Sequence, residues 1–119
     1  MFKKSMLGLA VVVFGACASV QIPPDRVQRS EASVRAASEL GAESVPAARL
    51  HLQMAKDQAV AAKRLAADGD ERASLVMARS EADAELALAL AREVAVRTEA
   101  VRAANELRSL QSRETPATP

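Results

Sequence analysis

The sequence predicts an all-α protein, an up-down-up antiparallel bundle whose long third helix extends past the other two and suits a coiled coil. Alanine supplies 25 of the residues after position 16, and arginine, leucine and glutamate, which also favour helices, follow it in frequency. Glycine and proline occur there only between the expected helices or at their ends. The predicted helices span 24–40, 45–67 and 70–113, and their short connections require successive helices to pack antiparallel.

The first predicted helix, 24–40, has a clear start and stop. Pro23 and Pro24 set the backbone for a first turn, and Asp25 suits the positive end of the helix dipole. Gly41 can take the left-handed conformation that ends a helix. One face carries the small and apolar residues Val27, Ser30, Val34 and Ala37.

The second predicted helix, 45–67, begins after Ser44 as a capping residue and has Pro46 in its first turn. The sequence Asp-Gly-Asp at 68–70 breaks it. We expect its buried face to contain Leu50, Met54, Ala61 and Leu65.

The third predicted helix, 70–113, is capped by Asp70 and contains no glycine or proline. At 1.5 Å per residue it would be about 66 Å long. Two stripes of apolar residues along this helix suggest that it contacts two neighbouring helices. The frequent alanines indicate a thin core. The first stripe contains Ala82, Leu86, Leu90 and Val94, and the second Ala84, Leu88, Ala91 and Ala95.

About twenty residues beyond Glu93 have no partner of matching length within the chain. Their apolar seam follows the four-three spacing of a coiled coil, at Val96, Ala100, Ala103, Leu107 and Leu110. Two interpretations stay open. The segment is either a solitary amphipathic helix held by pairs such as Glu93–Arg97 and Arg102–Glu106, or it self-associates into a homo-oligomer.

The first sixteen residues resemble a signal peptide, because two lysines precede the uncharged run LGLAVVVFGA. This run is shorter than the roughly 20 residues that span a membrane. Residues 14–17, Phe-Gly-Ala-Cys, resemble the lipobox of bacterial lipoproteins, and Cys17 is the only cysteine in the chain. The alternatives are an uncleaved signal anchor and a buried structural cysteine.

The lipobox resemblance implies that residues 1–16 are removed and that Cys17 carries the lipid. A thiolate is nucleophilic enough near neutral pH to take a diacylglycerol as a thioether. Residues 17–23 would then form a lipidated tether, with acyl chains such as palmitate holding the protein in the membrane. Ala18, in place of aspartate, resembles the signal for the periplasmic face of the outer membrane.

The charge of the chain after residue 16 argues against one class of binding partner, nucleic acid. Fourteen basic and fifteen acidic side chains give a formal charge of −1, which offers no electrostatic basis for binding nucleic acid. After the signal peptide and the tether, we expect the chain to form a helical domain at 24–113 and a disordered tail at 114–119.

Residues 41–91 resemble the small helical lipoprotein domain known as domain of unknown function 4398. The matching features are Gly41 with Ala42, Pro46, Ala55 and Ala59, Gly69 with Asp70, and the run of Ala82, Asp83 and Ala84 followed by Ala87 and Ala91. The resemblance implies a helical envelope protein and supplies no activity, because that family has no established one.

The sequence offers no catalytic, metal or cofactor site. His51 is the only histidine, and no serine or cysteine nucleophile is near it in the sequence. Asp83 and Glu85 are two apart on a helix and therefore point in different directions. An enzyme is the remote alternative.

The far end of the third predicted helix is basic, and four arginines form a candidate interaction surface: Arg97, Arg102, Arg108 and Arg113. They would make salt-sensitive contacts with anionic peptidoglycan or a periplasmic protein. The alternative is that they are solvated and complete the helix surface. The sequence thus predicts a lipid-anchored structural or adaptor module of the outer membrane, without catalysis, or alternatively a self-assembling coiled-coil lipoprotein.

Overall fold

The computed structural model describes residues 20–114. Within this range the chain forms three α-helices and one short 3-10 helix, and no strand. The predicted signal peptide, Cys17 and residues 115–119 lie outside the described residues. The elements are α1 (Pro24–Glu39), η1 (Ala42–Ser44), α2 (Pro46–Ala67) and α3 (Ala73–Glu114).

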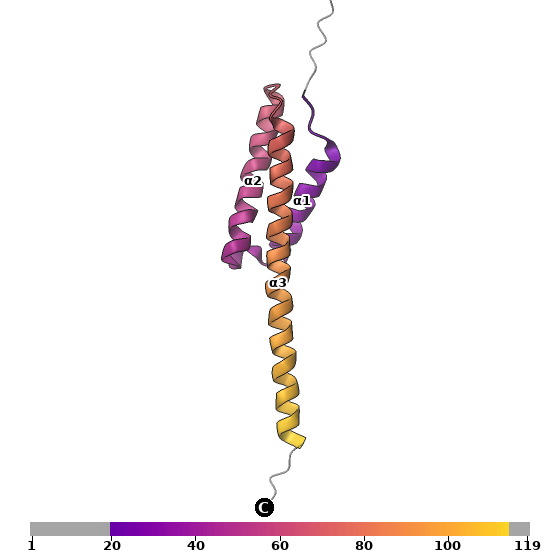
Figure 1. Cartoon of the computed structure of the whole chain (residues 1–119), viewed down its shortest axis with the longest axis vertical. Helices are drawn as coiled ribbons and strands as arrows, with labels where there is room; N and C mark the ends of the chain where they lie inside the picture. Colours follow the sequence, from indigo (N-terminus) through magenta and orange to yellow (C-terminus); the bar gives the residue numbers. More distant parts are fainter. Residues whose placement is uncertain (1–19, 115–119) are drawn as a thin grey trace, which may run out of the picture.

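The helices run up, down and up, as the sequence predicts. Figure 1 shows α3 crossing in front of α1 and α2, which lie on either side of it. α3 packs on both of them, whereas α1 and α2 touch each other much less. The chain enters α1 at the same end as the 68–72 turn, and α3 continues past the bundle at the other end.

The start of α3 differs from the prediction, because α-helix begins at Ala73 and not at residue 70. The backbone N–H of Arg72 donates to Asp70 Oδ1 at 2.9 Å, so Asp70 stabilises the turn before α3 and is not the N-cap of the α-helix as predicted. The N–H of Ala73 donates to the Asp70 carbonyl at 3.0 Å, which makes the intervening turn tighter than an α-turn. The other helix ends agree with the predictions to within one residue.

The corner between α1 and α2 depends on Gly41, whose φ of 76° is the predicted left-handed conformation. The prediction that Ser44 caps α2 is wrong. Its hydroxyl donates to the Gly41 carbonyl at 2.7 Å and so closes the corner. Val45 takes the N-cap position without a side-chain hydrogen bond, and Pro46 follows it as the first helical residue.

The core is thin and consists mainly of alanine, as predicted. Leu52 and Met77 are its large apolar side chains, and Leu52 is only 2% exposed. The predicted face of α1 is confirmed, since Ser30 and Ala37 are buried. The other buried apolar residues are Ala42, Ala48, Ala55, Ala62, Ala73, Ala84, Ala87 and Ala91.

The predicted face of α2 is wrong. Leu50 is 58% and Met54 is 38% exposed, while α2 buries the row of Ala48, Leu52, Ala55 and Ala62. Small side chains let the backbones of α2 and α3 approach closely. The larger side chains therefore stay at the margin of the contact.

Of the two stripes predicted for α3, the second is confirmed in part, since Ala84 and Ala91 are buried, and the first is wrong. Leu86 is 42% and Val94 is 41% exposed, so the first predicted stripe is not in the core. α3 buries a single narrow face, because α1 and α2 both lie behind it in the view of Figure 1, one toward its left and one toward its right. That face contains Ala73, Met77, Ser80, Ala84, Ala87 and Ala91.

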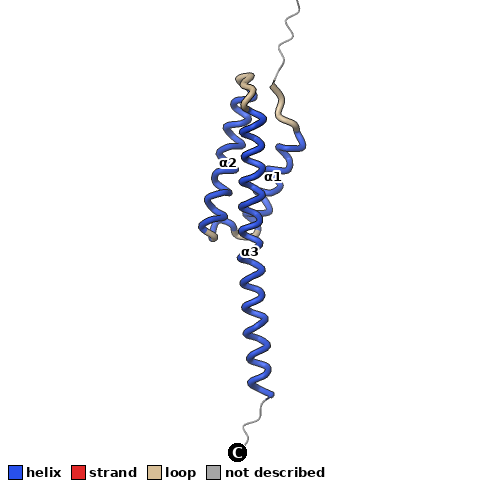
Figure 2. The backbone as a smooth tube through the Cα atoms, in the orientation of Figure 1, coloured by secondary structure: helices blue, strands red, loops and turns tan. Residues whose placement is uncertain are grey.

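Beyond Ala91, every described residue of α3 is exposed. We call this segment, residues 92–114, the arm. Figure 2 shows it as a direct continuation of the bundle part of α3. The 42 residues of α3 correspond to about 63 Å of helix. Within the described range, no helix is long and apolar enough to cross a membrane.

Candidate functional site

A buried chain of hydrogen bonds joins all three helices. The Ser80 hydroxyl of α3 donates to the Ala55 carbonyl of α2 at 2.8 Å. Its proton is then used, so the Ser30 hydroxyl of α1 donates to Ser80 Oγ across the second 2.8 Å contact. Both serines are at most 1% exposed. This chain fixes the register of the helices in a core that otherwise lacks directional contacts.

Asp83 is the centre of a second polar cluster, between α2 and α3. Its Oδ1 lies 2.8 Å from His51 Nδ1, and its Oδ2 accepts a hydrogen bond from Gln58 Nε2 at 2.8 Å. The side chains of Asp83 and His51 are 16% and 27% exposed. This pair resembles the orienting half of a catalytic triad, but the hydrogen bonds join it to Gln58 and to no nucleophile. Its evident role is to join α2 to α3.

Ion pairs connect the outer surfaces of the helices. Glu81 of α3, whose side chain is 14% exposed, pairs with Arg26 at 3.2 Å and with Arg29. Across the α1–α2 groove, Lys63 lies 2.9 Å from Glu31 and lowers the pKa of that carboxyl. An exposed pair such as Lys63–Glu31 contributes little to stability. Together these pairs join α1 to α3 and to α2.

The arm carries the four candidate arginines, and neighbours on the same helix contact three of them. Arg97 pairs with Glu93 at 2.6 Å, as predicted. Arg102 pairs with Glu99 at 3.1 Å, so its predicted partner was wrong. Arg108 donates to Asn105 at 3.0 Å. Within the described part of the chain, no ion pair of Arg113 is found.

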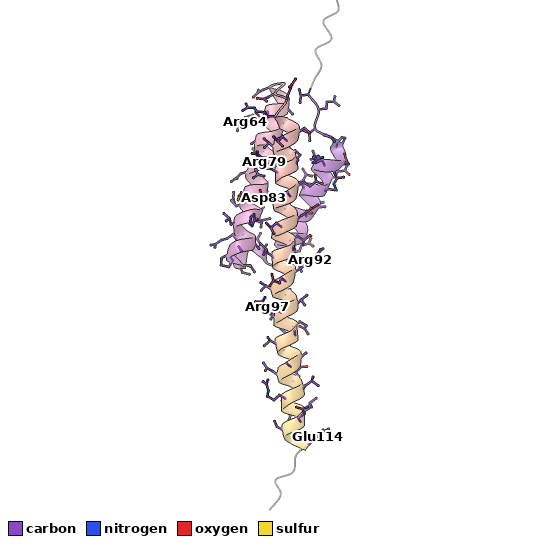
Figure 3. All side chains as sticks on the ribbon, viewed as in Figure 1. Arg64, Arg79, Asp83, Arg92, Arg97 and Glu114 are labelled. Carbon is purple, nitrogen blue, oxygen red and sulfur yellow. The ribbon has the colours of Figure 1, made fainter. Side chains whose placement is uncertain are left out.

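These arginines do not lie on one face. Arg97 and Arg108 are eleven residues apart, a rotation of only about 20°, and so are Arg102 and Arg113. The two pairs are separated by about 140° around the helix. In Figure 3, Arg92 lies at the edge of the bundle, Arg97 just beyond it and Glu114 at the far end. The arm therefore presents two arginine pairs and not a single basic patch.

The predicted apolar seam of the arm is exposed along its length. Val96 is 69%, Leu107 61% and Leu110 52% exposed. Nothing else in the described range covers these side chains. The arm therefore combines a continuous apolar strip with charged side chains, four of which form the ion pairs Arg97–Glu93 and Arg102–Glu99.

The two polar clusters inside the bundle were not predicted from the sequence. Ser30 was placed on the correct face of α1, but its partner Ser80 was not identified. The available signal was the four-three spacing of the buried face of α3, in which Ser80 takes one position. For His51 and Asp83 no local signal exists, because their contact depends on how α2 and α3 align.

Comparisons with protein-family models, with curated proteins and with solved structures found no match to this chain. The resemblance to domain of unknown function 4398 and to bacterial lipoproteins therefore stays a prediction from the sequence. Among residues 20–114, no group of three or more histidine, cysteine, aspartate or glutamate side chains is placed to hold a metal ion.

Proposed function

We propose that this protein is a lipid-anchored structural or adaptor module on the periplasmic face of the bacterial outer membrane, without catalysis. A lipid on Cys17 would hold one end, and the arm would present a binding surface away from the membrane. The single observation that carries this proposal is that α1 starts at one end of the bundle and α3 ends beyond the opposite end.

The geometry suits a spacer. Only five residues separate Cys17 from Pro23, so they hold the start of α1 within about 20 Å of the lipid. α1 leads away from its start, α2 returns, and the 68–72 turn lies at the same end of the bundle as the start of α1, which would be the lipid end. α3 then extends outward by about 63 Å. Such a rod separates its anchor from its binding surface.

The charges of the arm favour a protein partner over an anionic polymer. Residues 92–114 contain five arginines and four glutamates, a formal charge of +1. Ion pairs within the helix already occupy Arg97 and Arg102. Contacts with peptidoglycan through these side chains would be weak and salt-sensitive. The exposed apolar seam, by contrast, suits a helical protein partner.

The anchor is tested by changing Cys17→Ser in cells grown with an alkyne analogue of palmitate. The unchanged chain is expected to incorporate the label and to fractionate with outer membranes. The variant should lose the label and be retained unprocessed or released. Ser19→Ala, two positions away, is the matched control and should keep the label. A shortened, membrane-bound Cys17→Ser protein would contradict the anchor.

A second substitution tests whether the protein is held in the outer or in the inner membrane. If Ala18 permits export to the outer membrane, Ala18→Asp should leave lipid attachment intact and move the protein to the inner-membrane fraction. Sucrose-gradient fractionation measures this shift. Labelled protein that stays in the outer membrane after Ala18→Asp would argue against the proposed address while leaving the lipid anchor in place.

A further inference from the structure

We infer that a second copy of this chain packs along an exposed seam that runs the whole length of α3. The sequence shows this seam only on the arm, whereas the structure shows that it continues over the bundle. The inference adds a partner to the structural role proposed above, and it does not depend on the lipid anchor. We call this surface the α3 seam.

One row of the α3 seam repeats every seven residues and is exposed throughout. Leu75 is 56% and Val96 is 69% exposed. A second row, interleaved with the first, contains Leu86, Ala100 and Leu107, all exposed. The first row consists of Leu75, Ala82, Ala89, Val96, Ala103 and Leu110.

The α3 seam lies opposite the face that packs on α1 and α2. Met77 and Ala84 are fully buried, and each is two residues beyond an exposed seam residue, Leu75 or Ala82. Two residues of α-helix correspond to about 200°, which puts the rows on opposite sides. Figure 1 shows the near side of α3 uncovered by the described chain. A second α3 can therefore reach the seam without displacing either short helix.

The length of the α3 seam decides between a solitary arm and a dimer. The arm alone offers 96–110, about two heptads, and a coiled coil needs at least three or four. From Leu75 to Leu110 the seam extends over about five heptads and about 52 Å. With its flanking positions it presents about 20 residues, which is the size of one side of a stable interface.

The width of the seam and the charges beside it favour a second copy of this chain over a lipid surface as the partner. A strip of only two rows is the narrow pattern of a coiled coil, whereas helices that lie on membranes present a wider apolar face. Both signs of charge border it, with Glu85 and Glu99 among the acids and Arg92 among the bases. The two polar positions within it are Arg79 and Glu93, and Glu93 is already paired with Arg97.

The test compares valines on two faces of the arm. Val96, 69% exposed, is on the seam, and Val101, 57% exposed, is off it. The full chain, extracted in mild detergent, is expected to sediment as a dimer. Val96→Asp would bury a carboxylate in the interface and should raise the dimer dissociation constant at least about tenfold. Val101→Asp should leave it unchanged. Circular dichroism checks that both variants keep their helical content.

A second pair of substitutions tests the part of the seam that lies over the bundle. Leu86→Asp should weaken the dimer, whereas Leu50→Asp on the outer face of α2 should not. In cells, a photo-crosslinking amino acid at Val96 should give a product of twice the chain mass that contains only this protein.

A folded monomer at all concentrations would overturn the inference, as would a dimer unaffected by Val96→Asp. Insensitivity to Leu86→Asp would equally overturn a seam over the whole helix. A crosslink from Val96 to a different protein or to lipid would show that the seam binds that molecule and not a second copy of this chain, and would overturn the inference. Because palmitate labelling of Cys17 is measured separately, a failure here is distinguishable from a failure of the anchor.

Discussion

Replacing Leu52 with alanine tests the packing of the bundle most directly. Leu52 is 2% exposed, and it belongs to a cluster whose other buried members are all alanines. Its side chain is the largest among these buried members, and four partly buried side chains pack against the same cluster: Val34, Val45, Leu88 and Leu90. Leu→Ala substitutions in cores cost about 2 to 5 kcal/mol, with larger values where the site cannot collapse. Alanine methyl groups cannot reorient to fill a cavity, so we expect about 3 to 5 kcal/mol.

This loss is large for such a small bundle. Stabilities of about 0.05 to 0.15 kcal/mol per residue give the described part of the chain about 5 to 14 kcal/mol. The substitution would therefore remove a third or more of a mid-range stability. Since 1 kcal/mol shifts the melting temperature of a small domain by about 4 to 8 °C, the midpoint should fall by at least about 12 °C.

Leu50→Ala is the matched control, on the same helix and with the same atoms removed. Leu50 is 58% exposed, so its replacement should change the free energy of unfolding by less than about 0.5 kcal/mol. Urea unfolding followed by circular dichroism, at one fixed protein concentration, measures both variants. A larger loss for Leu50→Ala than for Leu52→Ala would refute the observed α2 face and restore the stripe predicted from the sequence.

Two further predictions concern polar contacts. Ser80→Ala should cost about 1 to 3 kcal/mol in urea unfolding, because it leaves the Ser30 hydroxyl buried without its acceptor. Ser30→Ala should cost less, since Ser80 keeps the Ala55 carbonyl; equal losses would contradict the assigned donor directions. Arg72 lowers the pKa of Asp70 to about 2, so this carboxylate contributes stability above its ordinary pKa of 3.8 and loses it as the pH falls toward 2. Asp70→Asn should flatten the acid side of the melting profile while keeping an acceptor oxygen for the Arg72 N–H; an unchanged profile would argue against this ion pair.

The helices were predictable because their boundaries depend on local chemistry. Pro24, Gly41, Pro46 and Gly69 act on their own segments of backbone, and each lies where the sequence placed a helix end. The buried faces were less predictable. With alanine on nearly every side of α2 and α3, the apolar pattern fits several rotations of each helix, and the largest side chains were a misleading guide.

The candidate surface was predictable only in part. The seam of the arm follows from the spacing of Val96, Leu107 and their neighbours, which requires no tertiary information. Its continuation over the bundle does not, because Leu75 and Leu86 count as seam residues only when α1 and α2 are known to occupy the other side. The separation of the four arginines into two pairs, by contrast, follows from their spacing on a single helix and requires no tertiary information.

The length of α3 and the thinness of the core are connected. Starting a helix is unfavourable, but α1 and α2 hold the first part of α3, so the arm needs only to extend an existing helix. Pairs such as Glu93–Arg97 then add a few tenths of a kcal/mol each. An alanine core brings little apolar area per residue, and the large apolar side chains that α3 exposes lie mostly on its seam. Packing two copies along that seam would bury these side chains without changing the bundle, so the stability of the whole protein should rise with its concentration.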